Sequence, residues 1–341
     1  MIVVMQAGAT PQEIDHVAQL IREMGLSDHV IHGTDLSVVA ATGDDRLLDK
    51  TAVSQAPGVD RVLDVLKPYK MAAREAKPEA PTRVCVGGRE DCIFGGTHLP
   101  VIAGPCSVEG EAEILAAARA VKAAGAHALR GGAFKPRTNP YSFQGLGEEG
   151  LKYLAAARAE TGLPIVTEVV TPSEVDLVAE YADCLQVGTR NSQNYRLLEA
   201  VGRQPRPVFY KRGMWMTLDE YLQAAEYILS NGNPNVILCE RGIRTFEKFT
   251  RNTLSLAAVA ELKLRTHLPV VVDPSHGTGV ARLVPAMCRA AVACGADGLA
   301  IETHVDPEHA VTDGSQSITP DVLAETLAVC RKVADAVGRA M

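Results

Sequence analysis

The chain has 341 residues, of which 47% are hydrophobic and 4% aromatic, and its formal net charge is −7. This length suits one small domain followed by one barrel, and the apolar share is enough for a sizeable core. Scarce aromatic residues and a negative charge argue against a nucleic-acid reader or a protein of acidic membranes, because both need a basic face.

Cysteine usage and the absence of long apolar runs bear on the compartment. The 8 cysteines form no CxxC pair, and most are expected to be reduced core residues. The first residues lack the basic segment and long apolar run of a secretory signal, and no stretch approaches the roughly 20 apolar residues of a membrane span. We expect a cytoplasmic protein that binds neither membranes nor nucleic acid.

Residues 1–66 alternate in the order β-α-β-β-α-β. Helical spacing of apolar residues within 11–24 predicts a helix that begins after the N-cap Thr10 and ends near Gly25. Gly33 and Thr34 suit a turn between the two middle strands. The pattern predicts a small ferredoxin-like domain, with strands at 2–5, 29–32, 37–41 and 59–65 and helices at 11–24 and 44–54.

Two short segments separate this unit from the rest of the chain. Residues 67–82 are polar and contain three prolines, which is typical of a linker. A short hairpin is then expected at 84–86 and 92–94, turned by Gly87 and Gly88. Such a hairpin suits the closure of the bottom of a barrel.

From about residue 99, short apolar strands alternate with longer helical stretches. This rhythm predicts a TIM (β/α)8 barrel over residues 83–341. A doubly wound open sheet is the alternative, but no GxGxxG follows the first strand. Strands are expected at 101–103, 128–130, 165–167, 184–187, 208–210, 236–238, 270–272 and 298–301, and helices at 111–124, 147–161, 173–181, 218–230 and 283–294.

Basic side chains gather where the barrel strands are expected to end. Active sites of such barrels lie at the C-terminal ends of the strands. Converging cations in an otherwise acidic protein favour phosphate and carboxylate ligands. The alternative for each residue is an ion pair with a nearby acid, or exposure to water. The residues are Arg130, Lys135, Arg137, Arg190, Lys211 and Arg241.

A second group combines one thiol, one imidazole and two carboxylates: Cys106, His276, Glu302 and Asp313. They follow the first, seventh and eighth strands, and the first and eighth strands are neighbours in a closed barrel. A mixed sulfur, nitrogen and oxygen set suits Mn²⁺, Fe²⁺, Co²⁺ or Zn²⁺ better than Ca²⁺. The alternatives are a packing role for the cysteine and a turn-capping role for the histidine.

Taken together, these strand-end segments resemble the 3-deoxy-D-arabino-heptulosonate 7-phosphate (DAHP) synthase family, in its type I form. The resemblance covers about residues 99–320, nearly the whole barrel. The small front domain resembles the regulatory domain of some members. The matching segments are AGPCSVEG, LRGGAFKPRTNPYSFQGLG, QVGTRNSQN, YKRGM, ILCERGIRTFE, DPSHGTG and IETHVDPEHAVTDGSQS.

The resemblance implies an enzyme that condenses phosphoenolpyruvate with erythrose 4-phosphate and water to give DAHP and phosphate, the first step of the shikimate pathway. It implies that Arg130, Lys135, Arg190, Lys211 and Arg241 hold phosphoenolpyruvate. Lys135, Pro136, Arg137 and Thr138 would line the erythrose 4-phosphate side, and a divalent metal ion on the four ligands, Asp313 included, would polarise the aldehyde. Lys135 is the expected proton donor, and Glu168 is expected to position the water.

The nearest alternative within the superfamily is 3-deoxy-D-manno-octulosonate 8-phosphate synthase, which uses arabinose 5-phosphate. Lys135-Pro136-Arg137-Thr138 departs from that family's pattern, and Cys106 matches the metal-dependent form. A non-catalytic sensor is a further alternative, marked by loss of a ligand or of Lys135, and none is lost.

The front domain has little core of its own, so two roles compete for it: binding an effector and mediating assembly. The resemblance implies feedback inhibition by Tyr or Phe in a homotetramer, with the domain closing over the barrel mouth.

Overall fold

The computed structural model describes residues 1–33, 36–43, 49–63, 68–137 and 139–341. The chain divides into two compact units, Met1–Pro81 with Leu264–His267, and Thr82–Lys263 with Leu268–Met341. Among the described residues, no helix is both long and apolar enough to cross a membrane. The cytoplasmic location stays a prediction.

The first unit is a four-stranded antiparallel sheet in the order β2-β3-β1-β4, with two helices between the strands. This order confirms the ferredoxin-like prediction. Parts of the expected 33–34 turn, of the 44–54 helix and of the 59–65 strand fall outside the described residues. The elements are β1 (Ile2–Met5), α1 (Pro11–Glu23), β2 (Ser27–His32), β3 (Ser37–Thr42), α2 (Lys50–Ser54) and β4 (Val59–Leu63).

Helix α1 forms because its start is capped and one of its faces is apolar. The Thr10 hydroxyl accepts from the Glu13 N–H at 3.3 Å, and the Glu13 carboxylate accepts from the Thr10 N–H at 2.7 Å. This reciprocal pair satisfies two helix N–H groups that would otherwise lack partners. The buried face of α1 carries Ile14, Val17 and Ile21, which belong to one core with β1 residues.

The other face of this sheet packs on the segment that was expected to be a linker. Ala76 clusters with Ile2, Val4 and Val38, and Tyr69 is 1% exposed. A 3₁₀ turn covers Arg74–Ala76. The segment expected to be a linker over 67–82 is therefore packed in part of its described length, because its small apolar residues cover a sheet face despite the polar composition around them.

The second unit is a closed barrel of eight parallel strands, in the order β10-β11-β12-β13-β14-β7-β8-β9. It confirms the predicted barrel, and several strands run one or two residues further than expected. Their C-terminal ends therefore carry polar residues into the barrel mouth. The strands are β7 (Val101–Gly104), β8 (Ala128–Arg130), β9 (Ile165–Val169), β10 (Cys184–Val187), β11 (Val208–Lys211), β12 (Val236–Glu240), β13 (Val270–Val272) and β14 (Gly298–Glu302).

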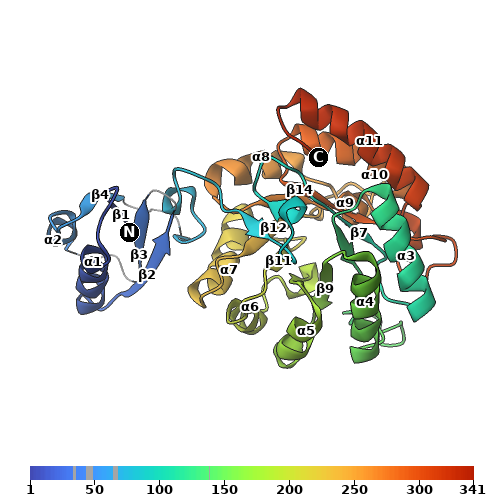
Figure 1. Ribbon diagram of the computed structural model, residues 1–341, viewed down its shortest axis with the longest axis horizontal. Coiled ribbons are helices and arrows are strands. Elements are labelled where there is room, and N and C mark those ends of the chain that lie inside the picture. Colours follow the sequence, from blue (N-terminus) through green and yellow to red (C-terminus); the bar gives the residue numbers. More distant parts are fainter. Residues whose placement is uncertain (34–35, 44–48, 64–67, 138) are drawn as a thin grey trace. The chain divides into compact units, whose positions relative to one another are not determined.

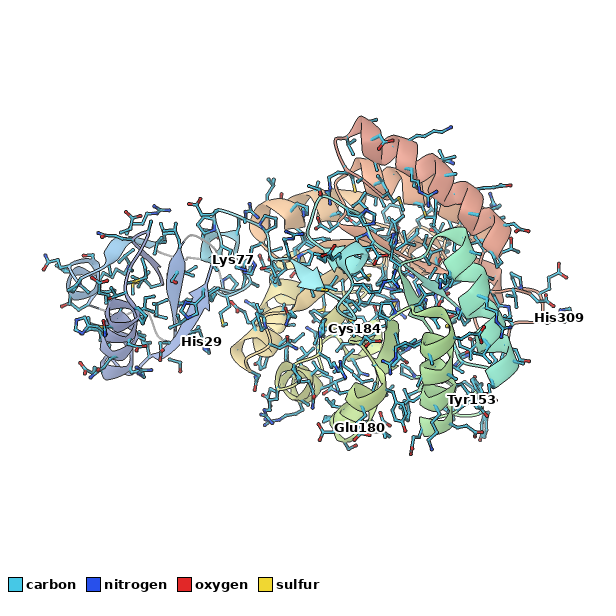
Figure 2. All side chains as sticks on the ribbon, viewed as in Figure 1. His29, Lys77, Tyr153, Glu180, Cys184 and His309 are labelled. Carbon is cyan, nitrogen blue, oxygen red and sulfur yellow. The ribbon has the colours of Figure 1, made fainter. Side chains whose placement is uncertain are left out.

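Helices surround these strands (Figure 1). Figure 2 shows Tyr153 and Glu180 on the outer helices, whereas Cys184 is buried at the start of β10. The expected helices are present, and the stretch predicted at 173–181 begins as a 3₁₀ turn, Pro172–Glu174. The helices are α3 (Glu111–Ala124), α4 (Glu148–Thr161), α5 (Val175–Tyr181), α6 (Tyr195–Gly202), α7 (Leu218–Ser230), α8 (Leu256–Arg265), α9 (Pro274–Thr278), α10 (Val284–Ala293) and α11 (Pro320–Ala336).

The predicted hairpin closes the N-terminal end of the barrel. Strands β5 (Val84–Cys85) and β6 (Ile93–Phe94) pair antiparallel. Phe94 is fully buried and shares a core cluster with residues near the starts of the barrel strands, such as Cys184 and Phe209. The lower half of the barrel interior is therefore apolar, and charged groups are left to the other end.

Candidate active site

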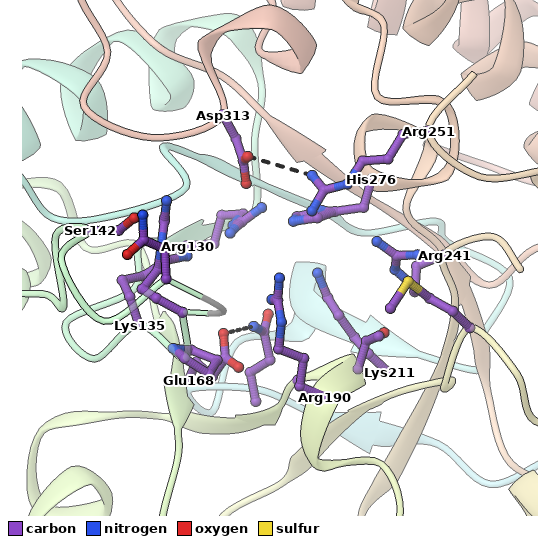
Figure 3. Close-up of a pocket in the computed structure, with 17 residues that line it drawn as sticks. Arg130, Lys135, Ser142, Glu168, Arg190, Lys211, Arg241, Arg251, His276 and Asp313 are labelled. Atoms are coloured by element: carbon purple, nitrogen blue, oxygen red, sulfur yellow. Dashed lines mark hydrogen bonds and ion pairs between the residues drawn. The ribbon is translucent and has the colours of Figure 1, made fainter. Parts of the chain in front are cut away.

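A cavity of about 250 Å³ opens at the C-terminal ends of the strands (Figure 3). Most of the residues that the sequence singled out line it. Cys106 and Glu302 lie beside it in the ligand cluster described below, and Thr138 lies outside the described residues. The predicted residues that line the cavity are Arg130, Lys135, Pro136, Arg137, Glu168, Arg190, Lys211, Arg241, His276 and Asp313.

The four predicted metal ligands lie together. One donor atom from each of Cys106, His276, Glu302 and Asp313 falls within 4.8 Å of the others. The Cys106 thiol donates to Asp313 Oδ2 at 3.2 Å, and His276 Nε2 lies 3.3 Å from Glu302 Oε1. Pairing of β14 with β7 sets Glu302 opposite Gly104, so the closing seam of the barrel brings these side chains together.

Asp273 orients the His276 side chain. Asp273 is the N-cap of α9: its Oδ1 accepts from the His276 N–H at 2.9 Å, and its Oδ2 lies 2.7 Å from His276 Nδ1. A proton on Nδ1 satisfies that contact, which leaves the Nε2 lone pair facing Glu302 and the cluster. A carboxylate behind an imidazole is the usual support of a metal-binding histidine.

The protonation states of the cluster suit a cation. Burial, together with Glu302, raises the pKa of Cys106 to about 12, and burial lowers the pKa of His276 to about 4. Burial opposes the charge of Glu302, but His276 and Arg130 outweigh it and lower the pKa of Glu302 to about 2. The imidazole and the carboxylate are thus ready ligands at neutral pH. The thiol needs a nearby cation to give up its proton, as metal-bound cysteines do.

The basic side chains of the cavity differ in how they are neutralised. Arg130 donates to Glu302 at 2.8 Å, and Lys211 donates to Asp273 at 2.7 Å. Arg241 is only 3% exposed, and within the described part of the chain it has no carboxylate partner, its one hydrogen bond being a 3.3 Å contact to the Gly242 carbonyl. Burial lowers the pKa of Arg241. A buried cation without a counter-charge is costly, so Arg241 indicates an anionic ligand.

Lys135 connects the cation group to the ligand cluster. Its Nζ lies 3.0 Å from both the Sγ and the carbonyl oxygen of Cys106. Across the cavity, Glu168 accepts from Gln186 at 3.2 Å. A Cβ on Gly188 would lie 1.9 Å from Glu168 Oε1, so a glycine there leaves room for that carboxylate inside the cavity.

Several polar residues of this region were not predicted. Arg251, from the loop after β12, lies 3.5 Å from Asp313 Oδ1 and donates to Gln316 at 3.0 Å. Gln316 in turn donates to Glu302. No motif signalled Arg251, because it lies eleven residues past the end of β12 at Glu240. Asp273 had a signal, since Asp-Pro three residues before a histidine is an N-cap pattern. The other unpredicted lining residues are Asn139, Ser142, Gln186, Gly188, Thr189 and Met214.

Asp313, one of the four predicted ligands, adopts an unusual backbone conformation. Its φ of 51° is the only positive value of a non-glycine residue among those described. Such conformations cost about 1 kcal/mol or more and gather at functional sites. The backbone of the loop after β14 is thus strained at Asp313, the residue whose carboxylate contacts Cys106 in the cluster.

Comparison with family models matches almost the whole chain. Residues 77–339 match the DAHP synthetase I family, and residues 1–67 match the DAHP synthase ferredoxin-like domain. A phospho-2-dehydro-3-deoxyheptonate aldolase of Thermotoga maritima is 45% identical, covering 99% of both chains. A 2-dehydro-3-deoxyphosphooctonate aldolase of Syntrophotalea carbinolica is 36% identical over 70% of this chain and 91% of the relative.

Solved structures agree with these matches. The crystal structure of the Thermotoga maritima phospho-2-dehydro-3-deoxyheptonate aldolase (DAHP synthase) superposes with a TM-score of 0.78 at 44% identity, covering 99% of this chain and 98% of that one. A truncated form of the Thermotoga maritima synthase gives a TM-score of 0.74 at 42% identity and covers 80% of this chain and 99% of that one.

Proposed function

The chain belongs to the DAHP synthetase I family, and on that premise we propose that it condenses phosphoenolpyruvate with D-erythrose 4-phosphate and water, with a divalent metal ion. The chain is an enzyme, a DAHP synthase with a ferredoxin-like domain in front of its barrel. The products would be DAHP and inorganic phosphate, and the reaction would be the first step of the shikimate pathway.

One observation carries the proposal: basic side chains that are not all neutralised line a cavity, and a cluster of Cys, His, Glu and Asp lies at its edge. Phosphoenolpyruvate brings a phosphate and a carboxylate, and the second substrate brings another phosphate. Guanidinium groups bind such anions through paired hydrogen bonds. Arg241, which is buried and forms no ion pair with a carboxylate among the described residues, would gain such a partner from a bound anion.

We assign the two substrates to different sides of the cavity. Arg130, Lys135, Arg190, Lys211 and Arg241 would hold phosphoenolpyruvate. The segment after β8 would receive the second substrate, with Pro136 shaping the site and Arg137 facing its phosphate. Support comes from the cavity lining, where Arg137 belongs to the same surface as Lys135 and Ser142.

Cys106, His276, Glu302 and Asp313 would hold the metal ion. Their mixed donor chemistry suits Mn²⁺, Fe²⁺, Co²⁺ or Zn²⁺. When bound, such an ion supplies Lewis-acid polarisation of a carbonyl oxygen. Arg130 and Gln316 fix Glu302, and Arg251 lies beside Asp313, so two ligands are oriented by neighbours.

The protein groups have definable tasks in the condensation. The C3 carbon of phosphoenolpyruvate forms a bond to the aldehyde carbon, and the aldehyde oxygen takes up a proton, for which Lys135 is the proposed donor. Water adds to C2 of the former enol, and Glu168 would position it. The C2–O bond to phosphate then breaks and leaves the ketone of DAHP. The Arg and Lys side chains of the cavity would hold both phosphate groups during these reaction steps.

Phosphate release from phosphoenolpyruvate tests the proposal directly. Activity is expected with erythrose 4-phosphate and should exceed that with arabinose 5-phosphate. Thorough chelation should abolish it, and a divalent ion should restore it. Activity with arabinose 5-phosphate alone would instead assign the chain to the octulosonate reaction, whose aldolases are also among its relatives. Full activity after chelation would rule out the metal.

We further propose that the front domain confers feedback inhibition by Tyr or Phe within a homotetramer. Support comes from its match to the DAHP synthase ferredoxin-like domain and from its small core. A chain that begins near residue 75 should keep its activity and lose inhibition, and the solved truncated relative gives a precedent for the shortened form. Undiminished inhibition of the shortened chain would place the effector site in the barrel.

A further inference from the structure

Asp273 contacts both halves of the active site. Its Oδ2 lies 2.7 Å from His276 Nδ1 and also accepts from Lys211 Nζ at 2.7 Å. The carboxylate is fully buried, and Oδ1 is occupied by the His276 N–H. Asp273 Oδ2 therefore contacts both His276, which belongs to the Cys106 cluster, and Lys211, which belongs to the anion site.

A neighbouring ion pair shows that this sharing is not a general feature of the barrel end. Arg212 donates to Glu240 at 2.7 Å, and Glu240 is as buried as Asp273. The second oxygen of Glu240 accepts from the Gly242 N–H at 2.7 Å. Neither Arg212 nor Glu240 lines the cavity. The two pairs match in length and burial, and only Asp273 touches functional groups on both sides.

We propose that Asp273 is a positioning residue that couples occupancy of the metal cluster to anion binding at Lys211. The inference rests on the proposed function, because it takes the Cys106 cluster as a metal site and Lys211 as an anion-binding group. The inference adds a coupling free energy between metal binding and anion binding, which the proposed function does not by itself include.

The direction of the coupling follows from charge. A cation on His276 Nε2 withdraws electrons from the imidazole, so Nδ1–H donates more strongly to Asp273. The shared Oδ2 then offers less negative charge to Lys211, whose ammonium group is freer to attract a phosphate or carboxylate. Metal binding should therefore tighten anion binding. By thermodynamic reciprocity, the anion tightens metal binding by the same factor.

Direct attraction between a metal ion and a nearby anion also gives positive coupling. Substitution of Asp273 separates the two causes. In Asp273→Asn the shape is kept, but the amide carries no charge to divide between His276 and Lys211. Coupling through Asp273 disappears in this variant, whereas direct attraction persists. Glu240→Gln is the matched control, because it alters an equally buried carboxylate that does not line the cavity and makes its side-chain hydrogen bonds to Arg212 and the Gly242 N–H.

The test measures binding, so it does not depend on turnover. Free Mn²⁺ is followed by electron paramagnetic resonance during titration of the full-length protein, with and without saturating phosphoenolpyruvate and without any aldose. In the unaltered protein and in Glu240→Gln, phosphoenolpyruvate should tighten Mn²⁺ binding by about fivefold or more, the lower range of typical couplings. In Asp273→Asn, Mn²⁺ binding should weaken about 10- to 100-fold, and the effect of phosphoenolpyruvate should fall below about twofold.

The outcomes separate this inference from the proposed function. Failure of the unaltered protein to bind Mn²⁺ or phosphoenolpyruvate would overturn the proposed function. Binding of both with equal coupling in the unaltered protein and Asp273→Asn would overturn the role of Asp273 alone. Should Asp273→Asn not fold, as judged by circular dichroism, Lys211→Met replaces it. In Lys211→Met the effect of saturating phosphoenolpyruvate on Mn²⁺ binding should likewise fall below about twofold, and retention of the full effect would refute the proposal.

Discussion

The two ends of the barrel interior hold opposite kinds of side chains. At the N-terminal end, Phe94 of the hairpin packs among apolar residues such as Phe209 and Val271. At the C-terminal end, Lys211 and Asp273 are just as buried but carry charge. These side chains are all shielded from water, yet apolar burial stabilises the first end, whereas desolvation of charges weighs against the second.

This difference indicates a division of labour along the barrel axis. At the hairpin end, the volume of each side chain matters because these residues fill the core. At the mouth, the charge and orientation of each side chain matter because these groups are proposed to bind ligands. Substitutions at the two ends should therefore separate stability from catalysis, and three predictions test that separation.

The largest effect is expected at the mouth. Lys135→Met removes the proposed proton donor and should lower kcat by about 10²- to 10⁴-fold. Urea unfolding should show little loss of stability, because the Lys135 side chain hydrogen-bonds only Cys106 among the described residues. Steady-state kinetics and unfolding curves measure the two quantities. Lys152→Met, which alters an exposed lysine paired with Glu148 on α4, is the control. A stability loss comparable to the kinetic loss would break the proposed separation.

An intermediate effect of the opposite kind is expected at the hairpin. Phe94→Ala should lower the free energy of unfolding by about 3–5 kcal/mol, because a buried ring leaves a cavity. Kinetic constants measured well below the unfolding temperature should stay within about twofold, a change of well under 1 kcal/mol. Ile93→Ala, at the adjacent and only half-buried position, should cost less. Kinetic constants that fall with Phe94 would mean that the plug shapes the mouth.

The smallest effect concerns pH at the same N-terminal end. Burial, with His98 next, lowers the pKa of His127 from 6.5 to about 4, while Asp91 opposes the shift and Arg89 and Arg331 add to it. Between these two pH values the unfolded chain binds more protons than the folded one, so stability is lost as the pH falls through that window. The loss should be about 3 kcal/mol.

His127→Gln keeps a side chain able to accept the bond from the Val101 N–H, 3.0 Å long in the unaltered chain, and removes the titrating group. Unfolding curves at several pH values should then show a shallower loss of stability than in the unaltered protein. If the free energy of unfolding depends on pH equally in both proteins, His127 does not cause the loss of stability.

The strands and the ligand cluster were accessible to sequence reasoning because each depends on a simple rule. Mostly apolar runs of three or four residues located the barrel strands, and the adjacency of first and last strands predicted that Cys106 would meet Glu302. Contacts that depend on side-chain reach were not accessible. The double contact of Asp273 and the approach of Arg251 to Asp313 require the positions of neighbouring strands and loops, which no local pattern encodes.

The linker shows a different kind of failure. Its prolines and charges dominated the composition, while Tyr69, Ala72 and Ala76 are buried within the first unit. Small apolar residues carry little weight in an average, but they suffice to cover a sheet face. Composition therefore misjudged a segment whose packing depends on a few positions.

The pairing of β14 with β7 also determines when the Cys106 cluster can form during synthesis of the chain. Cys106 and Asp313 are 207 residues apart in sequence and 3.2 Å apart in space. During synthesis, a growing chain displays the thiol long before either carboxylate has been made. The cluster can assemble only after the last strand, β14, has closed the barrel. An incomplete translation product therefore presents Cys106 without the complete set of four side chains that would bind the metal. Loading with metal would then mark a finished barrel.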